Sequence, residues 1–428
     1  MAARRTLVTV LLALLLAVSA LAWVRSAWHM PMRNIAFDFS INYTGARLLS
    51  LTGTDLPLYD RATLAAEAAR HGGWSGLYRG LYLTYIQTPV TAVLTLPFSR
   101  LPYDDARLAF LSFSNLLLLA TGAVMLWTLR PSWLLVVAAF AVFATYEPMF
   151  ESLRLGQVDA IIVFCLALAF ALLRRGPRPL MGVPLAVAAV LKLSPVVVIG
   201  YFAWRRWWGV VAAAAAALAA LGLVSVLVAG WENNLTFVRD IMPRLMKGSP
   251  WFYNVSISGA VLRAYLGRAY WAFEDEPPAL PLALRLALLA LDIAIVLAAY
   301  VATRRDAEAG FMLAVAVAIL ISPVSWSFYP TWLIPSLLWL VRRYEDRRAW
   351  PWLVALAILY PLVAISPEHF ERLSRELFAV PIKTVALAAY AGLLAWEGRA
   401  APAPARPGAA PAAGGGRPLR AGAAGTEA

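Results

Sequence analysis

The residue whose surroundings most favour acid–base chemistry is Asp38, which lies between Phe37 and Phe39 shortly after the first long apolar block. A carboxylate between aromatic rings at a membrane boundary is partly removed from water, which raises its basicity and suits it to abstract a proton. The alternative is structural, because aspartate is a favoured N-cap and Asp38 could cap a helix over Ser40–Leu49. The sequence at this position therefore predicts either a general base or a helix cap.

A second candidate is Lys192, which interrupts the apolar block Leu180–Trp204 in the run Lys192-Leu193-Ser194-Pro195. A charged side chain inside an apolar block is costly unless it is paired, so it is a functional candidate by default. The alternative is a lysine that extends to the lipid headgroups. Because both flanks of the block are basic, we expect two short half-helices that meet at Lys192, at the outer face or in a buried cavity.

The elements that position these residues must be membrane helices. Of the 428 residues, 61% are hydrophobic and only 14% are charged, whereas a soluble domain is nearer half apolar and a quarter charged. So much apolar surface cannot be hidden in one soluble core, which excludes a water-soluble enzyme. We predict an all-α polytopic membrane protein with about 10–12 transmembrane helices in residues 1–399, followed by a disordered Ala/Pro/Gly-rich cytoplasmic tail in residues 400–428.

The net charge of +13 is carried by short basic runs between the apolar blocks. This pattern is typical of cytoplasmic loops and does not indicate a nucleic-acid partner. It predicts a multi-pass protein of the plasma (inner) membrane with both termini in the cytoplasm. The runs are Arg4-Arg5, Arg174-Arg175, Arg205-Arg206, Arg304-Arg305, Arg342-Arg343 and Arg347-Arg348.

The N-terminal part of the chain contains two segments that are not ordinary spans. We favour an uncleaved first helix over a cleaved signal peptide at Leu7–Val24, because many spans follow. The segment Arg25–Tyr85 is then a long first extracytoplasmic loop. The next apolar block, Thr88–Phe98, is short and bracketed by prolines, so we expect a re-entrant or half-inserted element.

Polar clusters with few basic residues fall on the predicted outer face. A transporter would instead show polar residues buried within its spans and an internal repeat, and we find no convincing repeat. We therefore expect chemistry at the outer membrane boundary, with a transporter or lipid flippase as the alternative. The clusters are Phe37–Thr44, Arg154–Asp159, Asn254–Gly259 and Ser322–Trp326.

Four stretches, in this order along the chain, together resemble a known enzyme family. The first is Asp38–Tyr59, with an acidic residue, tyrosine, small residues and a closing Leu-Tyr, and the second is Leu155-Gly156-Gln157-Val158-Asp159, where the family usually has Gly-Gln-x-Asn. The third is Ala188–Pro195, which ends in Lys-x-x-Pro. The fourth is Ser322-Pro323-Val324-Ser325-Trp326. Between Arg33 and Trp339 the chain is similar to glycosyltransferase family 87, the polyprenol-phosphate-mannose-dependent α-mannosyltransferases. The resemblance implies a GT-C-like helical bundle.

The resemblance also implies a reaction. Asp38 would deprotonate a hydroxyl of a glycolipid or lipid-linked acceptor, which attacks the anomeric carbon of a polyprenyl-phosphate sugar with inversion. Because this donor is already activated, no cofactor and no metal is required, and the partners are membrane lipids rather than nucleic acid. Candidates for binding the donor phosphate are Lys192, Arg154, Arg33 and Arg263. Candidates for binding the sugar or acceptor are Tyr43, Gln157, Asp159, Asn254, Ser258, Ser325, Trp326 and Tyr329.

Two positions depart from the family pattern. Ser327-Phe328-Tyr329 stands where the family often has histidine after the tryptophan, and Asn254-Val255-Ser256 stands where Asn-Gln-Ser is expected. Because both positions would contact substrate, these departures concern the sugar and the acceptor more than the fold or the reaction class. A family member that has lost activity and serves as a structural partner is a third hypothesis.

Overall fold

The computed structural model describes residues 17–32, 36–52, 57–71, 85–176, 178–267, 280–367, 369 and 381–400. Regular structure in these residues is helical, apart from one isolated antiparallel β-bridge between Asn254 and Trp326. The predicted all-α class is therefore confirmed. The predicted first helix is described only from residue 17 onward, and residues 401–428 of the predicted tail lie outside the described residues.

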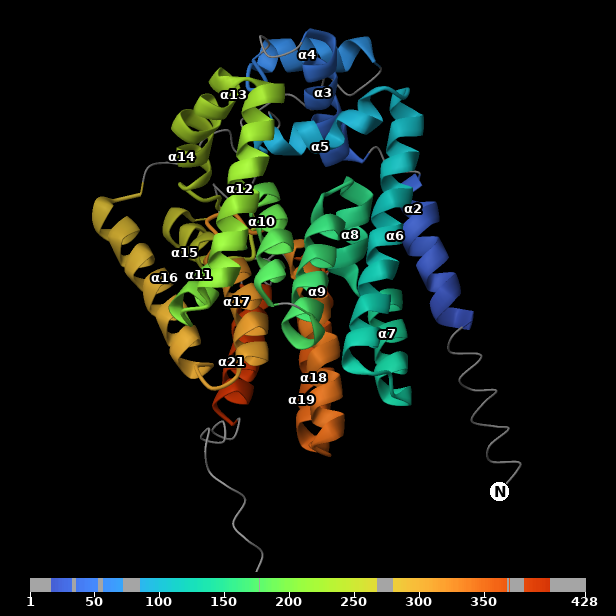
Figure 1. Ribbon diagram of the computed structural model, residues 1–428, viewed down its shortest axis with the longest axis vertical. Coiled ribbons are helices and arrows are strands. Elements are labelled where there is room, and N and C mark those ends of the chain that lie inside the picture. Colours follow the sequence, from blue (N-terminus) through green and yellow to red (C-terminus); the bar gives the residue numbers. More distant parts are fainter. Residues whose placement is uncertain are drawn as a thin grey trace, which may run out of the picture.

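Several helices have the length and composition of membrane spans (Figure 1). Three of them could cross a hydrocarbon core of about 30 Å unaided: α6 (Tyr103–Leu129), α12 (Trp208–Ala229) and α16 (Leu282–Ala302). A fourth candidate is the pair α7 (Trp133–Thr145) and α8 (Glu147–Leu155), which is bent by 45°. The chain is a multi-pass membrane protein, and the number of ten to twelve spans stays a prediction.

Shorter helices complete the bundle. Helix α17 (Ala307–Ile321) is buried along almost its whole length, whereas α16 exposes most of its apolar side chains, as expected of a helix that faces lipid. The other helices of the bundle are α9 (Asp159–Arg175), α15 (Ile257–Leu266), η8 (Tyr329–Leu333), α18 (Ile334–Asp346), α19 (Trp350–Ala364) and α21 (Ile382–Arg399).

One end of the bundle is covered by short helices (Figure 1). Part of the predicted long first loop is helical here, in α3 (Phe37–Thr52) and α4 (Arg61–Arg70). The predicted re-entrant element forms α5 (Pro89–Ser99), which packs against α3 and, at 11 residues, is too short to span the membrane. The remaining elements at this end are α13 (Trp231–Thr236), η6 (Phe237–Ile241) and α14 (Met242–Leu245).

The block around Lys192 is broken as predicted. Helix α10 (Gly182–Leu191) ends directly before Lys192, whose backbone is extended, and α11 (Val196–Trp204) begins after Pro195. Pro195 has no backbone N–H to donate to the carbonyl of Leu191, so the first half-helix cannot continue through it. The break places Lys192 between two apolar half-helices, toward the covered end of the bundle.

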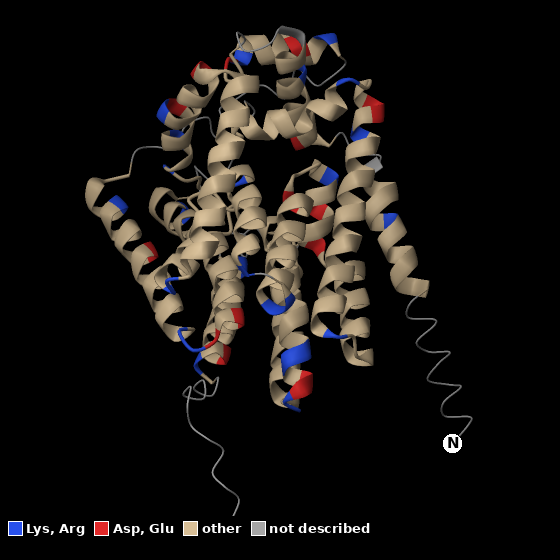
Figure 2. Ribbon diagram, in the orientation of Figure 1, with Lys and Arg blue, Asp and Glu red and all other residues tan. Residues whose placement is uncertain are grey.

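The basic runs gather at the opposite end of the bundle (Figure 2). Arg174 at the end of α9 pairs with Glu308 at 2.9 Å, and Arg343 in α18 pairs with both Asp306 and Glu397 at 2.7 Å. These ion pairs join the ends of α9, α17, α18 and α21. Within the described residues the predicted basic runs therefore lie together at one end of the bundle; Arg4-Arg5 lies outside these residues, and the cytoplasmic side stays a prediction.

Candidate active site

Asp38 lies in the first turn of α3 and is partly buried. Because the helix already begins at Phe37, Asp38 is not its N-cap residue, and the capping interpretation is wrong. Gln157 donates a side-chain hydrogen bond to Asp38, and the charges of Lys192 and Asp159 act on it. Helix α3 is not one of the spanning helices. Burial raises the pKa of Asp38 to about 6; Asp159 acts in the same direction, whereas Gln157 and Lys192 act against it.

Gly156 brings Gln157 to Asp38. It ends α8 with φ at +68°, a left-handed conformation that favours glycine. A Cβ atom on Gly156 would lie 2.5 Å from the Cβ atom of Phe39 and 3.1 Å from that of Ala36. The missing side chain therefore lets the end of α8 contact the start of α3, and the next residue reaches the carboxylate.

Lys192 is held in place by a carboxylate and two aromatic rings. Its Nζ lies 3.1 Å from Oδ2 of Asp159, and the Lys192 side chain is almost completely buried. The ammonium also lies 3.9 Å from the ring centroid of Tyr329 and 4.6 Å from that of Phe328. Trp332 donates its indole N–H to Asp159 at 2.6 Å, which fixes the carboxylate in turn. A lysine that extends to headgroups is therefore the wrong interpretation.

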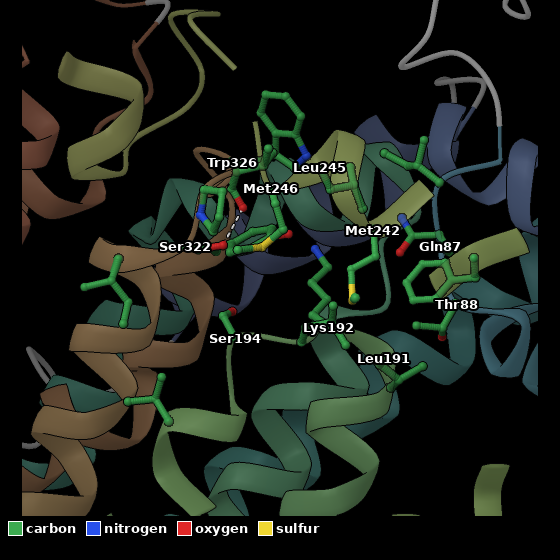
Figure 3. A pocket seen from close by; sticks show the side chains of 18 of the residues that line it. Gln87, Thr88, Leu191, Lys192, Ser194, Met242, Leu245, Met246, Ser322 and Trp326 are labelled. Carbon is green, nitrogen blue, oxygen red and sulfur yellow. Dashed lines mark hydrogen bonds between the residues drawn. The ribbon is translucent and has the colours of Figure 1, made fainter. Parts of the chain in front are cut away.

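The Lys192 side chain reaches into a cavity of about 260 Å³ (Figure 3). The wall formed by the break between α10 and α11 and by the residues before α5 carries most of the polar groups, with apolar side chains between them; the wall formed by η6 and α14 is apolar. This division suits an amphipathic molecule with a charged head and an apolar tail. The polar lining residues include Gln87, Thr88, Gln157, Lys192 and Ser194. The apolar ones include Phe237, Met242, Leu245 and Met246.

The loop after α17 contributes Trp326 to the same cavity, and η8 contributes Tyr329. Asn254 braces this loop: its Oδ1 accepts the backbone N–H of Ser325 at 2.9 Å, and its Nδ2 donates to the carbonyl of Pro323 at 3.0 Å. Because the amide of Asn254 is fully buried and bonded within the loops, it supports the cavity and does not face it. The two sequence clusters around Asn254 and Trp326 are thus joined by a side chain predicted to bind sugar.

Other predicted residues are placed away from the cavity lining. Arg263 is buried and donates to the backbone carbonyls of Trp251 and Asn254, and Arg154 is paired with Glu147. The Tyr43 hydroxyl donates to the carbonyl of Leu101 at 2.6 Å. Ser258 donates to the carbonyl of Pro323, the Ser325 hydroxyl is buried, and Arg33 lies outside the described residues. Asp159 contacts Lys192 and not the cavity.

A buried charged group that was not among the predicted residues lies behind the loop after α17. Lys383, in the first turn of α21, is 4% exposed and donates to the carbonyl of Ser327 at 3.0 Å. The Ser327 hydroxyl donates to the carboxylate of Glu151 in α8, and Lys383 and Glu151 attract each other. The neighbouring Thr384 donates to the carbonyl of Val255 at 2.9 Å. The start of α21 therefore holds both loops of the site, which the isolated charges in the sequence did not reveal.

We expect Lys383→Met to destabilise the protein. The variant keeps the apolar stem but removes the hydrogen bond to the Ser327 carbonyl and one of the positive charges that act on the buried Glu151, which should cost about 1–3 kcal/mol and lower the midpoint of thermal unfolding, measured by tryptophan fluorescence in detergent. The double variant Glu151→Gln/Lys383→Met removes both charges and should recover most of the loss. A single variant as stable as the wild type would show that the two charges do not support each other.

A multi-pass bundle with a half-buried carboxylate and a lysine beside an amphipathic cavity is the arrangement expected of a membrane enzyme that acts on a lipid-linked anionic substrate. Glycosyltransferase family 87 matches residues 85–323. The chain belongs to this family, and it is a membrane glycosyltransferase.

Named relatives support this assignment. The polyprenol-phosphate-mannose-dependent alpha-(1-2)-phosphatidylinositol mannoside mannosyltransferase of Mycobacterium tuberculosis is 29% identical over 353 residues, 76% of this chain and 74% of that protein. Its namesake from Mycolicibacterium smegmatis is 28% identical over 323 residues, 68% and 70% of the two chains. The corresponding phosphatidylinositol pentamannoside mannosyltransferase of Mycobacterium tuberculosis is 27% identical over 286 residues, 64% of this chain and 60% of that protein.

Proposed function

We propose that the protein transfers mannose from a polyprenyl-phosphate donor to a glycolipid acceptor, with Asp38 as the general base. The observation that carries this proposal is the joint position of Asp38 and Lys192: Gln157 bonds to the carboxylate, and both Gln157 and Lys192 line one amphipathic cavity. A base and a cation whose charges act on each other can serve the two ends of one displacement reaction.

In the proposed reaction, Asp38 accepts the proton of an acceptor hydroxyl while the hydroxyl oxygen forms a bond to the anomeric carbon. The bond between that carbon and the phosphate oxygen breaks, and its electron pair leaves with the polyprenyl phosphate. Attack from the side opposite the phosphate inverts the anomeric configuration. The ammonium of Lys192 lies where it can stabilise the charge that develops on the phosphate.

The two walls of the cavity support a lipid-phosphate donor. The phosphate would lie against Lys192 and Ser194, and the first isoprenoid units against Met242, Leu245 and Met246. The names of the relatives point to mannose as the sugar and to a phosphatidylinositol mannoside as the acceptor. An extracytoplasmic active site is supported by the basic runs, which lie at the opposite end of the bundle.

The direct test is transfer by the purified protein in vesicles. Polyprenyl-phosphate [14C]mannose is supplied with phosphatidylinositol mannosides or with phosphatidylinositol alone, and the lipid products are separated and counted. We expect label in the mannosides and, by NMR of the product, an anomeric configuration opposite to that of the donor. The proposal fails if an active relative labels lipid in the same vesicles and this protein labels none.

The rate should depend on pH through Asp38. The base acts only when ionised, and its pKa is about 6, so kcat/KM should be constant above that pH and fall about tenfold per pH unit well below it. Asp159→Asn should move this limb to lower pH, because the neighbouring negative charge that raises the pKa of Asp38 is removed. Initial rates between pH 4.5 and 8 measure both effects, and a flat profile over that range would exclude Asp38 as the base.

A further inference from the structure

Three arginines form a positively charged pocket at the end of the bundle opposite the candidate active site. Arg304 and Arg305 follow α16, and Arg399 is the last residue of α21. Together with Val301 and Ala302 they line a cavity of about 290 Å³, and all three arginines are exposed. The end of α16 and the end of α21 lie side by side at this end of Figure 1.

The nearby carboxylates are already bound to other arginines. Asp306 and Glu397 both pair with Arg343 at 2.7 Å, and Glu308 pairs with Arg174 at 2.9 Å. Glu397 also binds Arg347 at 2.8 Å. Within the described ranges, no carboxylate forms an ion pair with an arginine of the pocket. Among these residues, the three like charges of the pocket have no ion-paired carboxylate.

Packing, and not charge attraction, brings these arginines together. A Cβ atom on Gly398 would lie 2.5 Å from Cγ2 and 3.1 Å from Cα of Thr303, so the glycine lets the last turn of α21 contact the end of α16. Arg205 donates to the carbonyl of Arg304 at 3.1 Å, which holds the turn after α16. Like charges held close together repel, so an anion in the pocket would relieve this repulsion.

The location identifies the kind of anion. Helix α16 is a spanning helix that exposes its apolar side chains, and Val301, in the pocket wall, is 54% exposed. A residue just beyond the end of such a span lies at the level of the lipid headgroups. Arginine binds phosphate oxygens through paired N–H groups, and basic pockets at helix ends recognise anionic headgroups. We propose that this pocket binds the phosphate of an anionic phospholipid.

The test compares lipid binding by matched variants in nanodiscs. The pocket variant is Arg304→Gln/Arg305→Gln/Arg399→Gln. The control variant, Arg130→Gln/Arg206→Gln/Arg348→Gln, removes the same charge from three exposed arginines that do not line this pocket. Native mass spectrometry measures the phosphatidylglycerol and phosphatidylcholine retained by each protein. We expect the wild type and the control to retain phosphatidylglycerol preferentially, and the pocket variant to bind it at least about tenfold more weakly.

Three outcomes would overturn the proposal. The first is equal retention of phosphatidylglycerol by the pocket variant and the wild type. The second is an equal loss in the control variant, because the effect would then belong to net charge alone. The third concerns thermal stability: inorganic phosphate, added to the protein in phosphatidylcholine discs, stabilises it at least as much as phosphatidylglycerol does. That result would indicate a site for free phosphate. If the triple variant does not fold, Arg399→Gln tests the same comparison with a smaller expected loss.

Discussion

Replacing Asp38 with asparagine should lower the rate of mannosyl transfer by about 10²–10⁴-fold without unfolding the protein. Asparagine has nearly the same shape and still accepts a hydrogen bond from Gln157, but it cannot take a proton from the acceptor hydroxyl. Its side chain is neutral, so the cost of burying the carboxylate next to Asp159 disappears. The measurement is the initial rate with saturating donor and acceptor, at a pH above 6 where the wild-type base is ionised.

The matched control for this variant is Asp60→Asn. Asp60 is the N-cap residue of α4 and accepts a hydrogen bond from the backbone N–H of Thr63; Asp38 is bonded to the cavity residue Gln157, whereas the hydrogen-bond partners of Asp60 belong to α4. The same chemical change should therefore leave the transfer rate close to that of the wild type. A rate within about twofold of wild type in Asp38→Asn would remove Asp38 from the mechanism, while leaving the family assignment intact.

Replacing Lys192 with methionine should have an effect of similar size, a loss of about 10²–10³-fold in kcat/KM. Methionine fills much of the same space but cannot stabilise charge on the leaving phosphate. The change also leaves Asp159 buried without a cation, which should cost about 3–5 kcal/mol of stability. Two separate measurements are needed: transfer kinetics, and the thermal midpoint of unfolding.

The double variant Lys192→Met/Asp159→Asn separates these two effects. Removing both charges of the pair should restore the thermal midpoint, because no buried charge is left unpaired, but it should not restore transfer. If the double variant also regains wild-type kcat/KM, the role of Lys192 is to neutralise Asp159, and a different cation must act on the phosphate.

Local sequence was sufficient for some features of the site. Lys192 and Pro195 interrupt an otherwise apolar block, and the break between α10 and α11 follows from that pattern, whereas the burial of Lys192 was one of the alternatives that the pattern left open. The short, proline-bracketed block at Thr88–Phe98 forms a short helix for the same reason. Such features depend on the backbone preferences and the hydrophobicity of about ten neighbouring residues, and a single segment contains all of them.

Local sequence was not sufficient for the partners of polar side chains. Arg154, Arg263 and Asn254 have the right chemistry to bind phosphate or sugar. In the structure, however, Arg154 pairs with a carboxylate, and the other two bond to the backbone of loops. Conversely, Lys383 and Glu151 are far apart in the chain, and both bond to Ser327 in the same loop. The residue type determines whether a side chain can donate or accept a hydrogen bond. Which partner a buried polar group bonds to depends on the segments that pack against it.

The sequence by itself determined that this protein is a helical membrane protein of a glycosyltransferase family, and it singled out Asp38 and Lys192. It could do so because hydrophobic blocks, basic runs and short motifs are each contained in continuous segments. Only the tertiary structure decided that Gln157 bonds to Asp38, that Asp159 holds Lys192, and that η6 and α14 supply the apolar wall of the cavity. These contacts join segments distant in the chain, and they form only where helix packing and the close approach at Gly156 bring the segments together.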